Sequence, residues 1–135
     1  MNILVIDAQG GGVGKQLITA LKEEIKDAHI MAVGTNSVAT SAMLKAGADE
    51  GATGENSIIV ACRKADVIVG PLGITIADAM LGEITPKMAA AIGGSESKRV
   101  LIPFKNCDSI IVGLEEYTVG QLVKLAIEEV KKLKD

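Results

Sequence analysis

A glycine-rich stretch near the amino terminus carries the residues best suited to bind a ligand. Positions 3–16 read ILVIDAQGGGVGKQ, so an apolar run ends at an acid and is followed by four glycines and a lysine. Glycines let a backbone approach an anion closely, and the free N–H groups at a helix start attract negative charge. We therefore expect a phosphate cradle. Its predicted contacts are Asp7, Gly10, Gly11, Gly12, Gly14 and Lys15.

Two roles remain open for Asp7, whereas the position of Lys15 favours a single role for that lysine. Asp7 can bind a hydroxyl of a ribose or substrate, or it can accept hydrogen bonds from the N–H groups of its own loop. Lys15 falls in the first turn of the predicted helix, where the helix dipole disfavours a cation. A lysine in that place favours a part in anion binding.

The glycine loop matches the dinucleotide fingerprint only in part. The fingerprint reads G-x-G-x-x-G and is followed by an acid at the end of the second strand. Gly10, Gly12 and Gly14 give G-x-G-x-G, and the segment 34–36 offers glycine, threonine and asparagine in place of the acid. No arginine stands there to hold a 2′-phosphate. NAD(P) or another nucleotide stays open as the cofactor, but an ordinary NAD site is disfavoured.

Two further interpretations of the same loop are less favoured than an anion site. A P-loop reads G-x-x-x-x-G-K-[ST], but Gln9 replaces its first glycine and Gln16 replaces the hydroxyl that binds magnesium. A plain strand-to-helix turn needs fewer glycines, since each ordered glycine costs roughly 0.5–1 kcal/mol relative to alanine. Close backbone approach by an anion is therefore the preferred hypothesis.

Other loops add small polar residues to the same edge of the predicted sheet. Ligands of open α/β sheets bind beyond the carboxyl ends of the strands, where the segments 34–37, 53–56, 70–75 and 103–108 should meet the glycine loop. Asn36 has two interpretations, ligand contact or helix N-cap, and capping is favoured. The additional predicted contacts are Thr35, Asn36, Gly70, Gly73 and Thr75.

Residues suited to catalysis are scarce. His29 is the only histidine, and it begins the second predicted strand, at the opposite edge of the sheet. Cys107 follows the fifth strand with no histidine near it in sequence, so a Cys–His nucleophile is not expected. Cys62 should lie in the core, and Asp78 and Glu83 should lie on the surface. No metal site is predicted, and catalytic residues remain unassigned.

Alternating apolar runs and amphipathic stretches predict the elements that position this edge. They favour a three-layer α/β/α fold with a mostly parallel, Rossmann-like sheet of five to six strands, and a flavodoxin-like strand order is the alternative. A sixth strand at 109–113 would be antiparallel, because its link is too short for a crossover. The predicted strands are 2–7, 29–34, 48–53, 65–70 and 99–104. The first predicted helix begins at Val13, and further helices are predicted at 38–46, 56–64 and 119–133. An alanine- and methionine-rich helical stretch is also predicted, which breaks at Gly82 and restarts at 85–86.

Composition limits the partners. The chain has 135 residues, which predicts one domain over 1–135, and its net charge of -3 with one Phe and one Tyr disfavours nucleic acid. No apolar stretch reaches the roughly 20 residues of a membrane span, so a cytoplasmic protein is expected. A phosphorylated small molecule is the predicted partner, and a homo-oligomer is left open.

Several long blocks together resemble a known family. They include VIDAQGGGVGK, ADVIVGPLGI, MLGEITPKMAAAI and LIPFKNCDSIIVG. The chain resembles small uncharacterised bacterial proteins grouped as a domain of unknown function, and the resemblance implies a Rossmann-like fold and a self-standing protein. It brings no activity. The function hypothesis is a binder of a nucleotide or other phosphorylated molecule through the loop Gly10–Lys15; the alternative is a regulatory or scaffold protein with apolar contacts around Met80, Leu81 and Met88.

Overall fold

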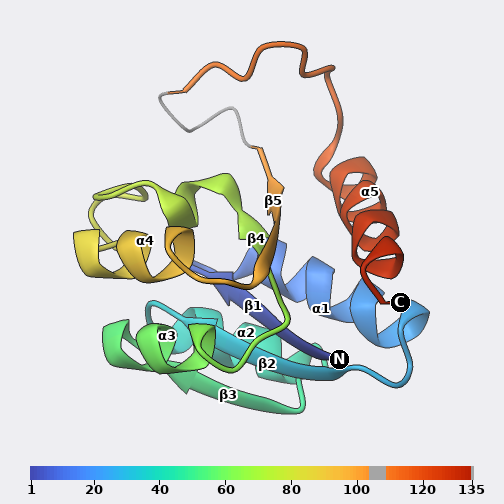
Figure 1. Cartoon of the computed structure of the whole chain (residues 1–135), viewed down its shortest axis with the longest axis horizontal. Coiled ribbons are helices and arrows are strands. Elements are labelled where there is room, and N and C mark those ends of the chain that lie inside the picture. The colour runs from blue at the N-terminus through green and yellow to red at the C-terminus, as the bar shows by residue number, and fades with distance from the viewer. Residues whose placement is uncertain (104–108, 135) are drawn as a thin grey trace.

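Five short strands form an entirely parallel sheet at the centre of the fold. The computed structural model describes residues 1–103 and 109–134 (Figure 1). The strand order is β3-β2-β1-β4-β5, as in a Rossmann-type sheet, so that choice is confirmed over the flavodoxin-like order. The strands are β1 (Asn2–Asp7), β2 (His29–Gly34), β3 (Glu50–Thr53), β4 (Val67–Pro71) and β5 (Lys98–Ile102).

The central strand explains why the first apolar run is continuous. In β1, Val5 is in register with Ala32 of β2 and with Val69 of β4, so both edges of the strand are paired. Both of its faces are covered by helices, and every residue from Ile3 to Asp7 is buried. A strand enclosed in this way has no use for alternating polar residues. Its carboxyl end, and the glycine loop that follows, therefore lie at the centre of one edge.

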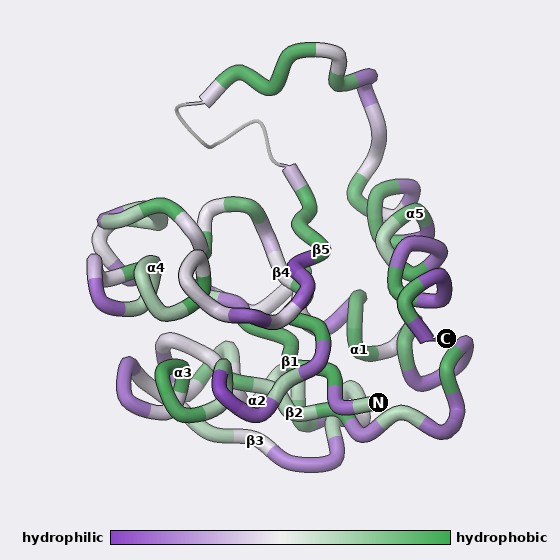
Figure 2. Tube along the Cα trace, viewed as in Figure 1, coloured by the Kyte–Doolittle hydropathy of each residue, from purple (hydrophilic) through white to green (hydrophobic). Residues whose placement is uncertain are grey.

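Helices cover both faces of the sheet. One apolar cluster joins the sheet to α1 (Gly12–Glu24), α2 (Ser37–Lys45) and α5 (Val119–Lys132), and a second joins it to α3 (Glu55–Cys62) and α4 (Pro86–Gly93). Figure 2 shows the apolar colour along the central strands and alternating colours along α5. The three-layer prediction is confirmed. In the part of the chain that the structure describes, no helix has the length and hydropathy needed to span a membrane.

The segment 76–84 differs from the expected helix. After a 3-10 turn (Leu72–Thr75), the backbone of Asp78, Met80 and Leu81 is left-handed, with φ of 65°, 57° and 58°. The Asp78 N–H donates to the Ile84 carbonyl at 2.7 Å and closes the loop, while the Ile84 side chain is fully buried. Burial of Ile84 therefore outweighs the helix propensity of the alanines. The restart is as predicted, since the Thr85 hydroxyl accepts from the Met88 N–H and caps α4.

The predicted sixth strand at 109–113 is wrong. Figure 1 shows this segment running away from the body of the protein before it enters α5. Ile110 and Val112 are 94% and 95% exposed, and Gly113 turns the chain with a φ of 84°. Ile110 to Val112 have β-forming side chains, but the sheet of the described residues provides no edge beside them, and strand propensity alone does not form a strand.

Candidate functional site

A cavity of about 820 Å³ lies beyond the carboxyl ends of β1 and β4. The glycine loop forms one wall, and the segment 76–81 forms the other. This is the edge where a Rossmann-type sheet holds its ligand. Its lining residues are Asp7, Ala8, Gln9, Gly10, Gly11, Gly12, Val13, Gln16, Pro71, Gly73, Ile76, Ala77, Asp78, Ala79, Met80, Leu81, Ser109 and Val119.

Packing explains two of the four loop glycines. Gly11 has a φ of 73°, and a Cβ on it would lie 2.9 Å from the Ala39 Cα of α2. A Cβ on Gly14 would lie 2.5 Å from the Met43 Sδ and 3.0 Å from the Asp7 Cβ. These two positions must be glycine so that α1 can start tightly between β1 and α2. Their presence needs no ligand.

Packing does not explain the other two glycines. A Cβ on Gly10 or on Gly12 would have no atom within 4 Å, and neither position has a left-handed φ. Both residues line the cavity. Within residues 1–103 and 109–134, no acceptor receives a hydrogen bond from the N–H of either one. The structure thus leaves two backbone donors and open space at the start of α1.

Asp7 is used by its own loop. Its side chain is buried, and its two oxygens accept the Ala8 N–H at 2.8 Å and the Gly14 N–H at 2.7 Å. Burial raises the pKa of this carboxyl, although the backbone N–H groups of Gly14, Ala8 and Val13 oppose the shift. The structure shows the loop hydrogen bonds of the second role that the sequence left open, and contact of Asp7 with a ligand hydroxyl stays a prediction.

Glu83 was expected to be a solvated surface residue, and that prediction is wrong. Its Oε1 accepts three hydrogen bonds, from the Gln9 N–H at 2.9 Å, the Thr35 hydroxyl at 2.7 Å and the Asn36 amide at 2.8 Å. Burial raises the pKa of Glu83, but these three hydrogen bonds outweigh it and leave the pKa lowered. No sequence signal could reveal this contact, because 48 residues separate Glu83 from Thr35.

Asn36 caps its helix, as favoured from the sequence. Its Oδ1 accepts the Ala39 N–H at 2.9 Å. The amide nitrogen of the same side chain donates to the Gln9 carbonyl at 3.0 Å and to Glu83. The cap of α2 is therefore also a support of the glycine loop.

The cavity includes only part of the predicted contact set. Gly70 lets β4 approach the Ile6 carbonyl of β1, and the Thr75 hydroxyl donates to the Leu72 carbonyl within its own turn. Lys15 is exposed and lies beside the cavity rather than in its lining, which instead includes Gln16 one position later. The structure brings Asp7, Gly10, Gly11, Gly12 and Gly73 together at the cavity, whereas its described lining does not include Gly14, Lys15, Thr35, Asn36, Gly70 or Thr75.

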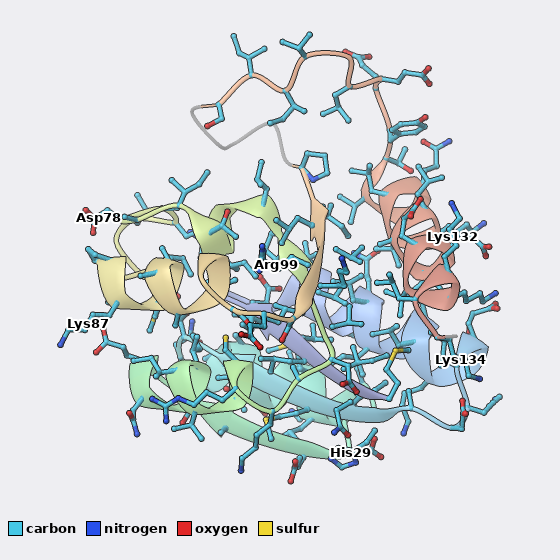
Figure 3. The ribbon with its side chains drawn as sticks, in the orientation of Figure 1. His29, Asp78, Lys87, Arg99, Lys132 and Lys134 are labelled. Carbon is cyan, nitrogen blue, oxygen red and sulfur yellow. The ribbon has the colours of Figure 1, made fainter. Side chains whose placement is uncertain are left out.

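The lining combines two carboxylates, Asp7 beside the glycine loop and Asp78 on the segment 76–81, with neutral polar and apolar side chains. Its polar side chains include Gln9 and Gln16, while the segment 76–81 supplies isoleucine, alanine, methionine and leucine. Among the described lining residues there is no lysine or arginine. An anion in the cavity would be held by neutral N–H donors. Figure 3 shows Asp78 far from His29, which lies at the amino end of β2.

Of the two cysteines, only Cys62 lies among the described residues. Cys62, the last residue of α3, is buried in the second apolar cluster, so it is a core residue as predicted, and burial raises the pKa of its thiol to about 11. Cys107 lies outside the described residues. Over the described ranges, no group of three or more His, Cys, Asp or Glu side chains is arranged to hold a metal ion.

Fold and cavity together define the class of protein, a Rossmann-type α/β protein with a cavity at the carboxyl edge of its sheet. The chain belongs to the family described as Domain of unknown function (DUF3842), whose model matches residues 2–135, so the resemblance in the sequence is confirmed. No curated protein matches the chain.

Solved structures that are similar to the chain include two FMN-dependent decarboxylases. An FMN-dependent cysteine decarboxylase, TvaF from thioviridamide biosynthesis, is 11% identical, with a TM-score of 0.52 over 98% of this chain and 85% of the other. A dodecameric FMN-dependent UbiX-like decarboxylase from Escherichia coli O157:H7 is 19% identical, with a TM-score of 0.47 over 97% of this chain and 76% of the other. At this identity, the first likeness concerns the fold alone.

Proposed function

We propose that this protein binds a phosphorylated small molecule of nucleotide type, with the phosphate against the N–H groups of Gly10 and Gly12. One observation carries the proposal. Two glycines line the cavity where packing demands none, and their N–H groups have no acceptor among the described residues. A bound phosphate accounts for both features, because it needs the donors and the space that a side chain would fill.

The electrostatics of the site suit a phosphate held without a cation. The 13 residues of α1 direct the positive end of their dipole at the cavity, equivalent to roughly half an elementary charge. Of the carboxylates near the glycine loop, Asp7 and Glu83 already accept hydrogen bonds from backbone and side-chain donors, and Asp78, the other carboxylate of the lining, is exposed to solvent on the segment 76–81. Binding should therefore depend only weakly on salt, in contrast to a site built from exposed lysines.

The cavity also favours a ligand with an apolar ring system. Its volume falls within the roughly 300–1,000 Å³ of small-molecule sites, and the segment 76–81 presents a wall opposite the glycine loop that is apolar except for Asp78. FMN combines a phosphate with such a ring, and the structural neighbour TvaF is described as FMN-dependent. FMN is therefore the first ligand to test. NAD(P) has less support, because Glu83, the carboxylate near the end of β2, already accepts three protein donors.

The test compares two glycines that both have open space. Binding of FMN, riboflavin, AMP, NAD⁺ and inorganic phosphate is measured by calorimetry for the wild type, Gly12→Val and the control Gly93→Val. Gly93 ends α4, and its Cβ also meets nothing within 4 Å. We expect FMN to bind more tightly than riboflavin, and only Gly12→Val to lose about tenfold or more, the equivalent of one good hydrogen bond to a charged group. Failure of the wild type to bind any member of the panel would refute the proposal.

A specific observation favours a second candidate function, in which the chain acts through contacts between copies. Leu81, Ile110 and Val112 are each at least 94% exposed, and Leu81 borders the cavity. Large aliphatic groups exposed to this degree are typical of interaction surfaces. Met88 was expected to be part of this surface, but it is buried. Sedimentation velocity should detect an oligomer that Val112→Asp dissociates; a wild-type monomer would exclude this function. A cytoplasmic location remains a prediction.

A further inference from the structure

The backbone of Gln9 is held from both sides in an uncommon conformation. Its φ is 51°, in the left-handed region that residues other than glycine rarely adopt. Its N–H donates to Glu83 at 2.9 Å, and its carbonyl accepts the Asn36 amide at 3.0 Å. Strain of this kind persists where surrounding contacts overdetermine it, and it gathers at functional sites. Gln9 directly precedes Gly10, so its conformation sets the direction of the peptide that carries the Gly10 N–H.

Glu83 follows two positions after the segment 76–81, which forms the opposite wall of the cavity. Its own N–H donates to the Met80 carbonyl at 3.2 Å, and the next residue, Ile84, is fully buried and donates to the Ala79 carbonyl at 3.2 Å. The segment 76–84 is thus anchored in the core close to Glu83. The Glu83 carboxylate then joins this anchored segment to the glycine loop, where it accepts the Gln9 N–H.

We propose that Glu83 is a positioning residue, which fixes the glycine loop and the apolar wall in their ligand-binding arrangement before any ligand arrives. This inference rests on the proposed function. Glu83 touches Gln9, Thr35 and Asn36, and it is absent from the described cavity lining, so it acts through the loop and not on the ligand. Preorganisation of this kind increases affinity, because the loop is already ordered and binding does not have to overcome the entropy loss of ordering it.

The hydrogen bonds of Glu83 give a sharp prediction for its conservative variant. All three donors are neutral, and all three bond to one oxygen, Oε1. A glutamine offers the same carbonyl oxygen, and it removes a negative charge beside an anion site. Glu83→Gln should therefore keep the arrangement, whereas Glu83→Ala should lose it.

Another glutamate provides a matched control. The Glu55 Oε1 accepts the Thr85 hydroxyl at 2.6 Å, so it joins α3 to the cap of α4 by the same kind of contact, without touching the glycine loop. Glu55→Ala controls for the loss of a carboxylate and of one bond to a threonine hydroxyl. It should leave the glycine loop and the cavity unchanged.

The experiment measures amide hydrogen exchange and FMN affinity on the same variants of the full chain. In the ligand-free protein, we expect Glu83→Ala to accelerate exchange at the Gln9 amide about tenfold or more, since a hydrogen bond to a charged acceptor is lost. The affinity for FMN should fall by a similar factor. Glu83→Gln and Glu55→Ala should stay within about twofold of the wild type in both measurements.

The two proposals fail in different ways. If the wild type binds no phosphorylated ligand, the proposed function fails, and the positioning role for that function fails with it even if Gln9 exchange accelerates in Glu83→Ala. If the wild type binds FMN but Glu83→Ala leaves exchange or affinity unchanged, only the positioning role is refuted. Loss of affinity in Glu83→Gln with slow Gln9 exchange would instead make Glu83 a direct ligand contact, and this outcome also overturns the inference.

Discussion

Replacement of Gly14 by alanine tests whether packing or ligand binding requires each glycine of the loop. The added Cβ would lie 2.5 Å from the Met43 Sδ and 3.0 Å from the Asp7 Cβ. Met43 is fully buried and Asp7 is nearly so, which leaves little free volume to absorb the methyl group. Overpacking of this kind costs roughly 1–3 kcal/mol. Alanine in a helix recovers up to about 1 kcal/mol relative to glycine.

The net expectation for Gly14→Ala is a loss of about 1–2 kcal/mol in the free energy of unfolding. Gly12→Ala is the matched comparison, because its methyl group meets nothing within 4 Å and lies in the first turn of the same helix. Its stability should be unchanged or higher by a few tenths of a kcal/mol. The two substitutions are chemically identical and lie two positions apart, so only their surroundings differ.

Urea denaturation measures both variants. With an m value of roughly 1–3 kcal/mol/M, a loss of 1–2 kcal/mol lowers the urea midpoint by about 0.3–2 M. The reasoning is refuted if Gly14→Ala is as stable as the wild type, or if Gly12→Ala is destabilised as much as Gly14→Ala. In either case the close approach of α1 to α2 would not be what requires glycine at position 14.

Two further predictions concern ionisable groups. Burial raises the pKa of Asp7 in the folded protein above its unfolded value, so protonation of Asp7 favours the folded state. Urea titrations at several pH values give the unfolding free energies of the wild type and of Asp7→Asn. The wild-type value minus the Asp7→Asn value should fall as the pH rises from below pH 4 through the folded-state pKa. A difference that rises with pH would contradict the burial argument. The Cys62 thiol, with a pKa of about 11, should resist a thiol reagent at pH 8 in native Cys107→Ser protein and react once urea unfolds the chain; fast native labelling would show that the site opens.

The glycine loop illustrates how far a motif can be read. Its partial matches to the dinucleotide and P-loop patterns concern residue types, whereas the structure assigns each glycine a different reason. Gly11 and Gly14 serve the contact with α2, and Gly10 and Gly12 leave donors and space at the cavity. Lys15, which the pattern singled out, lies beside the lining. The anion hypothesis now depends on backbone groups rather than on a charged side chain.

Sequence patterns alone predicted the framework of the fold, because a buried face of a strand or helix requires apolar residues at a regular spacing along the chain. The run of β1 is apolar throughout since helices cover both of its faces, and α5 shows one buried stripe that includes Val123, Ile127 and Val130. The cap at Asn36 and the start of α4 at Thr85 were also predictable, because a cap acts within a few residues.

Tertiary structure alone decided the rest, because the deciding contacts join residues far apart in the chain. Whether Gly12 or Gly14 must be glycine depends on where α2 lies, and the glycine itself carries no sign of it. The burial of Ile84 made 76–84 a loop despite its helix formers, and the absence of a described partner left 109–113 without a strand. Glu83 lies next to Gln9 although 74 positions of sequence separate the two residues, because the fold brings their segments together.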